Sequence, residues 1–359
     1  MKQLLLLFAC TVLVGCDRGS SEVSVSLDRI DSFEVHETDS LYVGDFLAMH
    51  YGPDSLFWTT DYIRKQLFAF DKSGEIVQTV GREGNGPGEF SNLMHAIHVG
   101  NRLLTKERFG YTFFNSSYDY QGAVRLPEGT VDESFWGLAS FNEWLLVGGT
   151  ELGNGTSIQA QSSDPAVLVL DSTFSLIFAF GQFPQAYQNN KWTMRDRDVA
   201  VNIDGMVAVV FRLSSEIHFY NLGDFDANLL EVVNFDSETF RAPDVTSTVG
   251  QSREEQIQFL ERTSLVNRVF FTSPDNVVVY YSNPRENWDG QVGDDSTIEH
   301  YLVSYTLGNE NVNTIRLPGP LLGVDGDGVL LIRLSNSDKK REIGRFKLRS
   351  TIFISEGLP

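Results

Sequence analysis

The chain has 359 residues and a formal net charge of −20 at pH 7, with 48 acidic against 28 basic residues. This charge excludes a general nucleic-acid-binding surface, because an acidic protein repels phosphate backbones. The hydrophobic content of 42%, with 26 Phe, suffices for a large core and favours strands, since flat aromatic rings pack well on pleated surfaces.

The chain begins with a segment typical of export. Lys2 precedes an apolar run at residues 4–14, which is too short to span a bilayer of roughly 30 Å. The run leads into Leu-Val-Gly-Cys, which resembles the lipobox of bacterial lipoproteins. The resemblance implies cleavage before Cys16 and a lipid on its sulfur; the alternative is an ordinary signal peptide with a cysteine by chance. We predict a signal peptide at residues 1–15, a lipidated tether at 16–22 and a folded domain at 23–359.

The lipobox interpretation has consequences for chemistry and location. Cys10 would leave with the signal and Cys16 would carry lipid, so the mature chain would hold no free thiol. Disulfides, thiolate metal sites and cysteine nucleophiles would then be excluded together. The predicted location is the bacterial cell envelope, anchored to a membrane at the periplasmic face or the cell surface. We expect a monomer without a cofactor.

The first predicted unit contains three strands at residues 56–60, 66–70 and 76–80. A turn with the sequence Asp-Lys-Ser-Gly from Asp71 separates the last two, and Ser-Gly after a polar pair is typical of antiparallel hairpins. The order strand, turn and strand recurs along the chain. Asp204 and Asp325 each begin Asp-Gly, six residues and Arg-Leu-Ser. Looser copies of this pattern begin at Asp54, Gly100, Asn142 and Asp275.

These six copies predict an all-β, six-bladed propeller of four-stranded antiparallel blades. A blade takes roughly 40 to 50 residues, and wider gaps before Asp204 and Asp275 indicate insertions. One insertion, near residues 252–266, is predicted to be helical, because Ser252 and Glu255 form a capping-box pattern ahead of an apolar face. Strands at 329–334 and 345–354 should pair with an N-terminal strand near 23–35 and close the last blade.

The glycine-rich stretch "GREGNGPGEF" at residues 81–90 separates two predicted strands. It lacks the Lys-Ser/Thr ending and the following helix of a phosphate-binding loop, so we interpret it as a connection between blades 1 and 2. Together with the turn at Phe70, Asp71 and Gly74, the stretch resembles the repeat of NHL-type propellers. More closely, it resembles the six-bladed propeller lipoproteins of Bacteroidota. The resemblance implies a fold and little chemistry, because most members have no assigned activity.

Residue types that commonly bind metals give no strong pattern. His95 and His98 are three apart, which on a strand places them on opposite faces, so they are not expected to share a metal. Asp325 and Asp327 are interpreted as a turn rather than a calcium loop, because residue 336 is Asn where an EF-hand has Glu. The acidic loop at residues 287–296, with Asp289, Asp294 and Asp295, is interpreted as solvated charge, and the alternative is a weak calcium site. We therefore predict no metal ligands and no catalytic residues.

Aromatic and basic residues supply the candidate ligand contacts. Sugar-stacking platforms are sought among Trp136, Trp144, Trp192 and Trp288. Trp192 and Trp288 lie in polar loops and are the better candidates, whereas Trp144 is expected in the core. Arginines recur at one repeat position, eight residues after the start of a copy. That position holds Tyr62, Arg108, Thr150, Arg212, Asn283 and Arg333. Arg64 and Arg285 lie two residues beyond it in blades 1 and 5. These five arginines predict a basic mouth for a carboxylate, sulfate or phosphate; the alternative is that they form structural ion pairs.

Two functions are compatible with these patterns. The first is a non-catalytic, lipid-anchored propeller that binds a small anionic molecule, a glycan, a peptide or another envelope protein. The second is a metal-dependent hydrolase or lyase of the lactonase type, which requires acidic and amide side chains to meet around an ion at the axis. The sequence alone does not identify such a set.

Overall fold

The computed structural model describes most of the chain. The described residues are 21–38, 41–108, 110–132, 134–151, 164–189, 194–235, 237–243, 252–285, 288, 297–309, 311–337 and 340–354. The predicted signal peptide, Cys16 and the tether up to residue 20 lie outside them. No helix in this part of the chain is long and apolar enough to cross a membrane.

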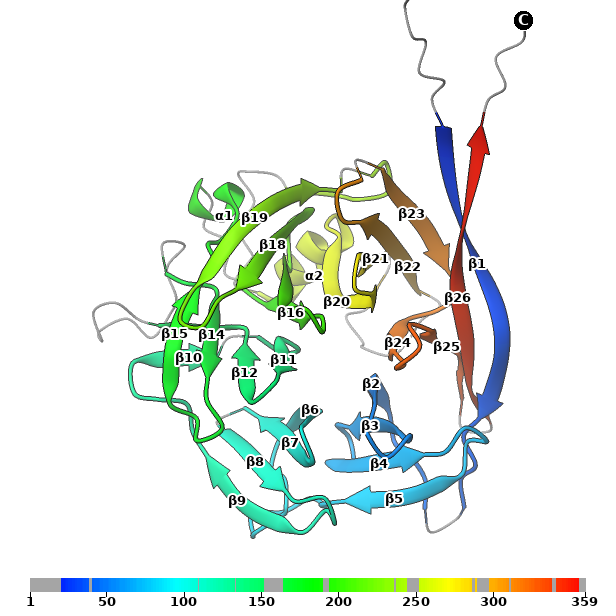
Figure 1. Cartoon of the computed structure of the whole chain (residues 1–359). Coiled ribbons are helices and arrows are strands. Elements are labelled where there is room, and N and C mark those ends of the chain that lie inside the picture. Colours follow the sequence, from blue (N-terminus) through cyan, green and yellow to red (C-terminus); the bar gives the residue numbers. More distant parts are fainter. Residues whose placement is uncertain are drawn as a thin grey trace, which may run out of the picture.

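Six antiparallel four-stranded sheets surround a central axis as the blades of a propeller, which confirms the predicted fold (Figure 1). Blade 1 contains β2 (Phe46–Tyr51), β3 (Phe57–Asp61), β4 (Gln66–Phe70) and β5 (Ile76–Val80); blade 2 contains β6 (Leu93–Val99), β7 (Arg102–Glu107), β8 (Gly110–Phe114) and β9 (Tyr120–Val124); blade 3 contains β11 (Leu138–Phe141), β12 (Trp144–Val147), β14 (Val167–Leu170) and β15 (Leu176–Phe180). Blade 4 contains β16 (Arg197–Val201), β17 (Met206–Phe211), β18 (Glu216–Leu222) and β19 (Ala227–Asn234); blade 5 contains β20 (Leu265–Ser273), β21 (Asn276–Pro284), β22 (Ile298–Thr306) and β23 (Val312–Leu317); blade 6 contains β24 (Leu321–Val324), β25 (Leu330–Ser337), β26 (Lys340–Ile354) and β1 (Ser21–Glu34). The remaining elements are α1 (Gln185–Asn189), α2 (Arg253–Glu261) and a small ribbon of β10 (Thr130–Asp132) and β13 (Gly149–Glu151).

Strands near the axis are buried on both faces, as β17 illustrates. Val207, Val209 and Phe211 belong to an apolar cluster shared with blade 3, whereas Ala208 and Val210 belong to a cluster shared with blade 5. Because successive side chains of a strand point to opposite faces, an unbroken apolar run lets one strand contact both neighbouring blades. The apolar run of each repeat therefore forms the packing between blades.

The predicted repeat falls at the same turn in every blade. All six copies begin in the turn between the first and second strand of a sheet. In blade 4 the Asn202 side-chain oxygen accepts hydrogen bonds from the amides of Asp204 and Met206, both at 2.9 Å. Side chains of this type stabilise tight turns by accepting from the backbone two and four residues further on. The repeat is therefore a turn motif followed by the central strand of a blade.

The glycine-rich loop connects the outer strand of blade 1 to the inner strand of blade 2, as predicted. Gly81 has a φ of 72°, and a Cβ there would lie 2.1 Å from the Phe90 ring, so both conformation and space require glycine. Within the loop, the Glu89 carboxylate accepts from the Gly86 amide at 2.9 Å and pairs with Arg82 at 2.6 Å. Glu89 therefore stabilises the loop through contacts within the loop.

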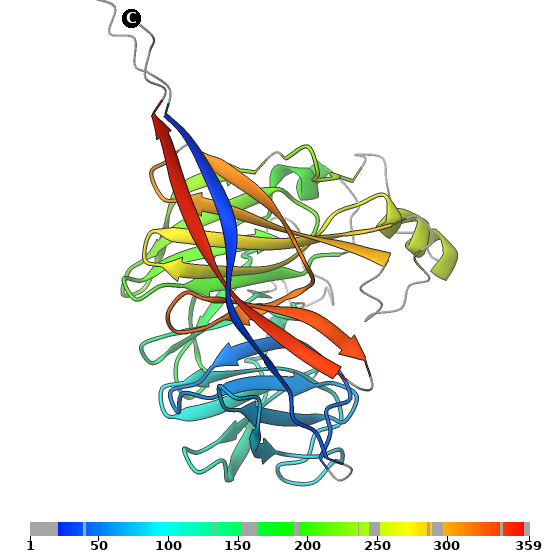
Figure 2. The ribbon, with the colours of Figure 1, turned by 90° about the vertical axis from the view of Figure 1, so that its right-hand side faces the viewer.

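The two ends of the chain close the ring in blade 6, which confirms the predicted closure. β1 lies outermost and pairs antiparallel with β26 along almost its whole length (Figure 2). Arg29 pairs with Glu342 at 2.7 Å, and Arg345 pairs with Asp31 at 2.9 Å across the two strands. β26 begins at Lys340, earlier than predicted, and Lys340 pairs there with Ser337 of β25.

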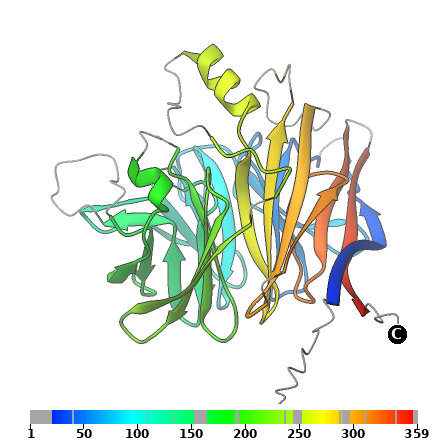
Figure 3. The same ribbon diagram turned by 90° about the horizontal axis from the view of Figure 1, so that it is seen from above.

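The predicted helical insertion is α2, which lies between blades 4 and 5. Ser252 accepts from the Glu255 amide at 3.2 Å, and the Glu255 carboxylate accepts from the Ser252 amide at 3.0 Å, so the capping box is present. The helix ends at Glu261 rather than near residue 266, because the chain enters β20 at Leu265. α2 stands on one face of the propeller, above the ends of the strands (Figure 3).

Candidate functional site

A cavity of about 440 Å³ lies near the axis on the face that carries α2, whose Leu260 forms part of the wall. Blades 4, 5 and 6 contribute strand ends, and blade 3 contributes Ser134, Phe135 and Trp136 from the segment before β11. No described residue of blade 1 or blade 2 lines it. The cavity is therefore off-centre, although the fold that forms it is a ring.

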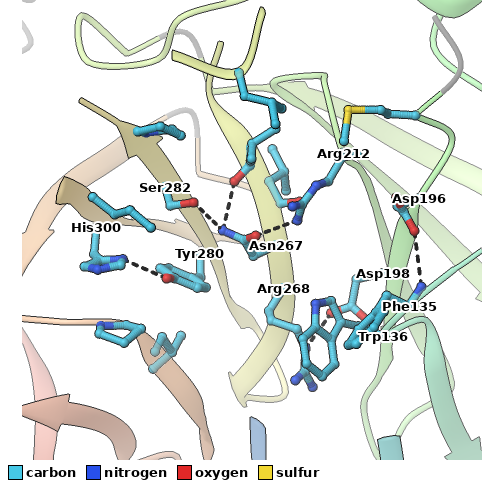
Figure 4. A pocket seen from close by; sticks show the side chains of 18 of the residues that line it. Phe135, Trp136, Asp196, Asp198, Arg212, Asn267, Arg268, Tyr280, Ser282 and His300 are labelled. Atoms are coloured by element: carbon cyan, nitrogen blue, oxygen red, sulfur yellow. Dashed lines mark hydrogen bonds and ion pairs between the residues drawn. The ribbon is translucent and has the colours of Figure 1, made fainter. Parts of the chain in front are cut away.

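Three polar side chains form one wall of this cavity, and we call Arg212, Asn267 and Ser282 the polar wall (Figure 4). They come from the end of β17, the start of β20 and the end of β21. The Arg212 guanidinium donates to Asn267 Oδ1 at 2.5 Å, and the Asn267 amide nitrogen donates to Ser282 Oγ at 2.9 Å. Ser282 Oγ accepts here, and among the described residues its own proton has no acceptor.

Arg212 carries a charge that the described protein does not neutralise locally. No carboxylate of the described residues lies within ion-pair distance of it, and its Nε is buried without an acceptor. Its second hydrogen bond goes to the Val266 carbonyl at 3.3 Å. Burial lowers the pKa of Arg212 and the more distant Asp196 opposes this, but a guanidinium remains protonated at pH 7. A cation with unfilled donors is costly in a protein interior unless a ligand completes its hydrogen bonds.

His300 and Tyr280 lie on the same side of the cavity as Ser282 (Figure 4). Burial, followed by the charges of Arg333 and Arg285, lowers the pKa of His300 to about 4, so the imidazole is neutral at pH 7. Nδ1 lies 2.8 Å from the Tyr280 hydroxyl, and Nε2 is buried with no partner in the described protein. When the Tyr280 hydroxyl donates to Nδ1, the proton resides on Nε2, which is then a buried donor without an acceptor among the described residues.

The other arginines of the cavity make local contacts. Arg268 pairs with Asp198 at 3.2 Å and lies over the Trp136 ring at 5.1 Å. Arg333 pairs with Asp45 at 3.0 Å, and both side chains are buried. Arg197 donates to the Ala166 carbonyl and to Thr150 Oγ1, each at 2.8 Å. Four arginines and two aspartates line the cavity, so its wall is basic although the chain as a whole is acidic.

The structure brings together only two of the five arginines predicted to form a basic mouth. Arg212 and Arg333 line the cavity. Arg108 lies in a separate groove on blade 2, Arg64 stacks on the Tyr42 ring at 4.2 Å, and Arg285 is exposed and pairs with Glu299 at 3.4 Å. The position beyond the second strand therefore does not lead to one place in every blade.

The remaining residues at the repeat position have structural contacts. The Tyr62 hydroxyl donates to Asp45 at 3.3 Å, and Thr150 accepts from Arg197. Asn283 is buried and donates to the Thr239 carbonyl at 2.8 Å. Tyr62 and Thr150 therefore help to position the carboxylate and the guanidinium that neighbour the cavity.

The tryptophans divide between cavity and core. Trp288 and Trp136, two of the four tryptophans considered as stacking platforms, both line the cavity. Trp144 packs against an apolar cluster, which confirms its expected place. Trp192 lies outside the described residues. Trp136 lies in the connection before β11, where no repeat or periodicity ranked it above Trp192.

As predicted, His95 and His98 have different neighbours. His95 is buried against Trp136, with ring centroids 5.6 Å apart, whereas His98 Nδ1 lies 2.9 Å from Nε2 of His50. Burial lowers the pKa values of all three imidazoles. The pairing of His50 with His98 joins the inner strands of blades 1 and 2, and no sequence spacing indicated it.

Potential metal ligands are scattered in the described part of the chain. There, no group of three or more His, Cys, Asp and Glu side chains is arranged to hold a metal ion. Asp325 stabilises a turn, as interpreted: its Oδ1 accepts from the amides of Asp327 and Val329, and its Oδ2 accepts from Arg345 at 3.1 Å. Asp289, Asp294 and Asp295 of the acidic loop lie outside the described residues.

The protein is a six-bladed propeller with a basic, off-centre pocket on the face that carries α2. Residues 26–319 match the model of the family DUF5128, described as a 6-bladed beta-propeller. The chain belongs to this family. A comparison with curated protein sequences found no match.

Solved structures show the same fold at low sequence identity. A member of the DUF4221 family from Bacteroides vulgatus is 11% identical with a TM-score of 0.69, covering 91% of this chain and 99% of that one. A putative exported protein from Bacteroides fragilis is 15% identical with a TM-score of 0.59, covering 91% of this chain and 95% of that one. At these identities the likeness concerns the fold alone.

Proposed function

We propose that this protein is a lipid-anchored, extracytoplasmic binding propeller whose cavity holds the anionic group of a small molecule. The Arg212 guanidinium carries the proposal, because it lines the cavity, has no carboxylate partner among the described residues and keeps a buried donor without an acceptor. Guanidinium groups form strong two-point hydrogen bonds with carboxylate, sulfate and phosphate. Such an anion would supply the acceptors that Arg212 lacks.

Ser282 and His300 support the same class of ligand. Ser282 keeps an unused donor among the described residues, and His300 has an unpartnered Nε2. Arg212 directly follows β17 of blade 4, whereas Ser282 and His300 lie in β21 and β22 of blade 5, so the donors come from two neighbouring blades. A ligand rich in acceptors fits this arrangement, whereas a cationic ligand would face Arg212 and Arg333.

The cellular location rests on two observations. The Leu-Val-Gly-Cys sequence ends a short apolar segment at Cys16, and the structural relative from Bacteroides fragilis bears the description of a putative exported protein. Both favour export, and the sequence ending at Cys16 also favours attachment to a membrane through an N-terminal lipid. A glycan, peptide or envelope protein that presents an acidic group would satisfy the same contacts. No contact among the described residues favours the metal-dependent hydrolase or lyase over binding.

Binding of simple anions tests the site. We expect sulfate or phosphate, exchanged for chloride at constant ionic strength, to raise the melting temperature of the wild type more than that of Arg212→Gln. Sulfate also stabilises proteins through general exclusion, so the difference between the two proteins is the readout. Arg349→Gln, which changes an exposed arginine of β26, serves as the matched control. Equal anion-dependent shifts in wild type and Arg212→Gln would refute anion binding at this cavity.

Cell fractionation tests the anchor. We expect the wild type to partition with membranes and to incorporate a labelled fatty acid, and we expect Cys16→Ala to lose both properties. Membrane association and processing of Cys16→Ala like those of the wild type would refute lipidation without affecting the assignment of the cavity.

A further inference from the structure

We infer that the cavity binds an amphipathic organic acid, whose anionic group contacts the polar wall and whose apolar body, the size of one or two rings, lies on the apolar side chains around it. The inference rests on the proposed function and adds the chemical class of the ligand. It distinguishes an organic acid from an inorganic ion, which would need only the polar wall.

The apolar side of the cavity is built from several elements. Phe135 and Trp136 come from blade 3, Leu260 from α2, Ile298 from the start of β22 and Pro320 from the segment before β24, and all of them are partly exposed. Partly exposed apolar groups that line a concave site gain free energy when a ligand covers them, at about 25 cal/mol per Å². Among the described residues, these groups surround the same space into which the polar wall faces.

The size of the cavity agrees with this division. A volume of about 440 Å³ lies within the range of pockets that take drug-sized ligands, whereas an inorganic anion on Arg212 would fill only a small part of it. The remaining space would hold water against apolar side chains, which is unfavourable. A ligand with an apolar body removes this water while its anionic group satisfies the polar wall.

Trp136 is held in place before any ligand arrives. Its ring lies edge-on to Phe135 with centroids 4.4 Å apart and edge-on to His95 at 5.6 Å, and the Arg268 guanidinium lies 5.1 Å from its centroid. Arg268 is itself fixed by Asp198. Figure 4 shows Trp136 across the cavity from Ser282 and His300. An aromatic group fixed in this way contacts a ligand body at little entropic cost.

Two dyes that share their aromatic rings serve as probes. Anilinonaphthalene sulfonate carries an anionic group, whereas phenylnaphthylamine is neutral, and both fluoresce more strongly when they enter an apolar site. We expect the sulfonate to bind with a stoichiometry of one and at least about tenfold more tightly than the neutral dye, since a charge-assisted hydrogen bond is worth that factor or more. Inorganic sulfate should compete with the sulfonate dye for the site, but its dissociation constant should be at least about tenfold larger than that of the dye.

Variants separate the two parts of the site. Arg212→Gln should weaken the sulfonate dye about tenfold or more and change the neutral dye less than about twofold. Ile298→Thr and Leu260→Gln should weaken both dyes by about three- to tenfold and leave the affinity for sulfate unchanged, because they remove only apolar contact. Leu229→Gln, on the exposed outer strand of blade 4, controls for unspecific dye binding and should change nothing.

The outcomes distinguish this inference from the proposed function. If sulfate binds in an Arg212-dependent manner as tightly as the sulfonate dye, or Ile298→Thr and Leu260→Gln leave both dyes unchanged, the amphipathic ligand is wrong and the anion site stands. If Arg212→Gln changes neither the sulfonate dye nor sulfate, both proposals fall. Circular dichroism and melting temperatures of each variant exclude unfolding as the cause of lost binding.

Discussion

Two arginines at the same position of the repeat, Arg212 and Arg333, line different sides of the cavity and have different partners. On the side of blades 4 and 5, Arg212 contacts Asn267 and has no carboxylate partner among the described residues. On the side of blade 6, Arg333 pairs with buried Asp45 at 3.0 Å. We call blade 6 and residues 35–45 the closure region, because the two chain ends meet there. The repeat therefore places an arginine at the cavity in both blades. Whether this arginine is structural or available to a ligand depends on the segment packed against it, which supplies a carboxylate to Arg333 and an amide to Arg212.

The closure region should dominate stability. Deleting residues 17–36 removes β1, leaves β26 with one free edge and takes away the ion pairs of Arg345 with Asp31 and Arg29 with Glu342. We expect this deletion to abolish cooperative thermal unfolding, which calorimetry would measure. Deleting only residues 17–20, the part of the predicted tether that precedes β1, is the control and should leave the melting temperature unchanged. A long deletion as stable as the full chain would show that the ring does not depend on its closing strand.

Substitution of Arg333 tests whether its buried ion pair with Asp45 stabilises the fold. Arg333→Met leaves the Asp45 carboxylate buried without its cation, and loss of one partner of a buried pair costs about 3 to 5 kcal/mol. Denaturant unfolding should show this loss. The double variant Asp45→Leu with Arg333→Met should recover most of the lost stability, because no buried charge remains. An Arg333→Met protein as stable as the wild type would mean that the ion pair of Arg333 with Asp45 does not stabilise the fold, and that Arg333 is no more structural than Arg212.

Much of the fold follows from the sequence because its signals are local. The turn at Asp204, the capping box at Ser252 and the alternation of apolar residues in the closing strand each involve residues within a few positions of one another, and all three are present in the structure. The length of the helix was less predictable. α2 ends at Glu261 and β20 begins at Leu265, because pairing within blade 5 outweighs the local helix propensity.

The cavity was only partly predictable because its contacts are long-range. Arg333 and Asp45 are 288 residues apart, and Asn267 reaches Arg212 from another blade. Arg108 illustrates the limit of the repeat: β8 begins at Gly110, so a very short hairpin follows β7 and Arg108 lies in a groove on blade 2. Sequence spacing located the ends of the strands, but the loops beyond them decide which side chains meet.

His300 provides a test by pH, because burial and, after it, the charge of Arg333 in the closure region lower its pKa. The folded pKa is about 4 and the unfolded value about 6.5, so between these values the unfolded chain binds more protons. Stability from this group is complete above pH 6.5 and is lost as pH falls to 4, by about 3 kcal/mol. We expect urea unfolding of His300→Gln to lose less stability than the wild type between pH 7 and pH 4. Parallel curves for the two proteins would contradict this role of His300.

Substitution of Arg212 should have the smallest effect on stability. Arg212→Met removes the hydrogen bonds to Asn267 and to the Val266 carbonyl, but it also removes a buried cation whose Nε has no acceptor, so the two effects on stability oppose each other. We expect a change in unfolding free energy within about 1 kcal/mol, well below that of Arg333→Met at the same repeat position. Denaturant titrations of the two variants side by side measure the difference. If both substitutions cost the same, Arg212 is as structural as Arg333, and the availability of its guanidinium to an anion loses its basis; a small loss together with abolished anion binding would assign the two arginines to different tasks.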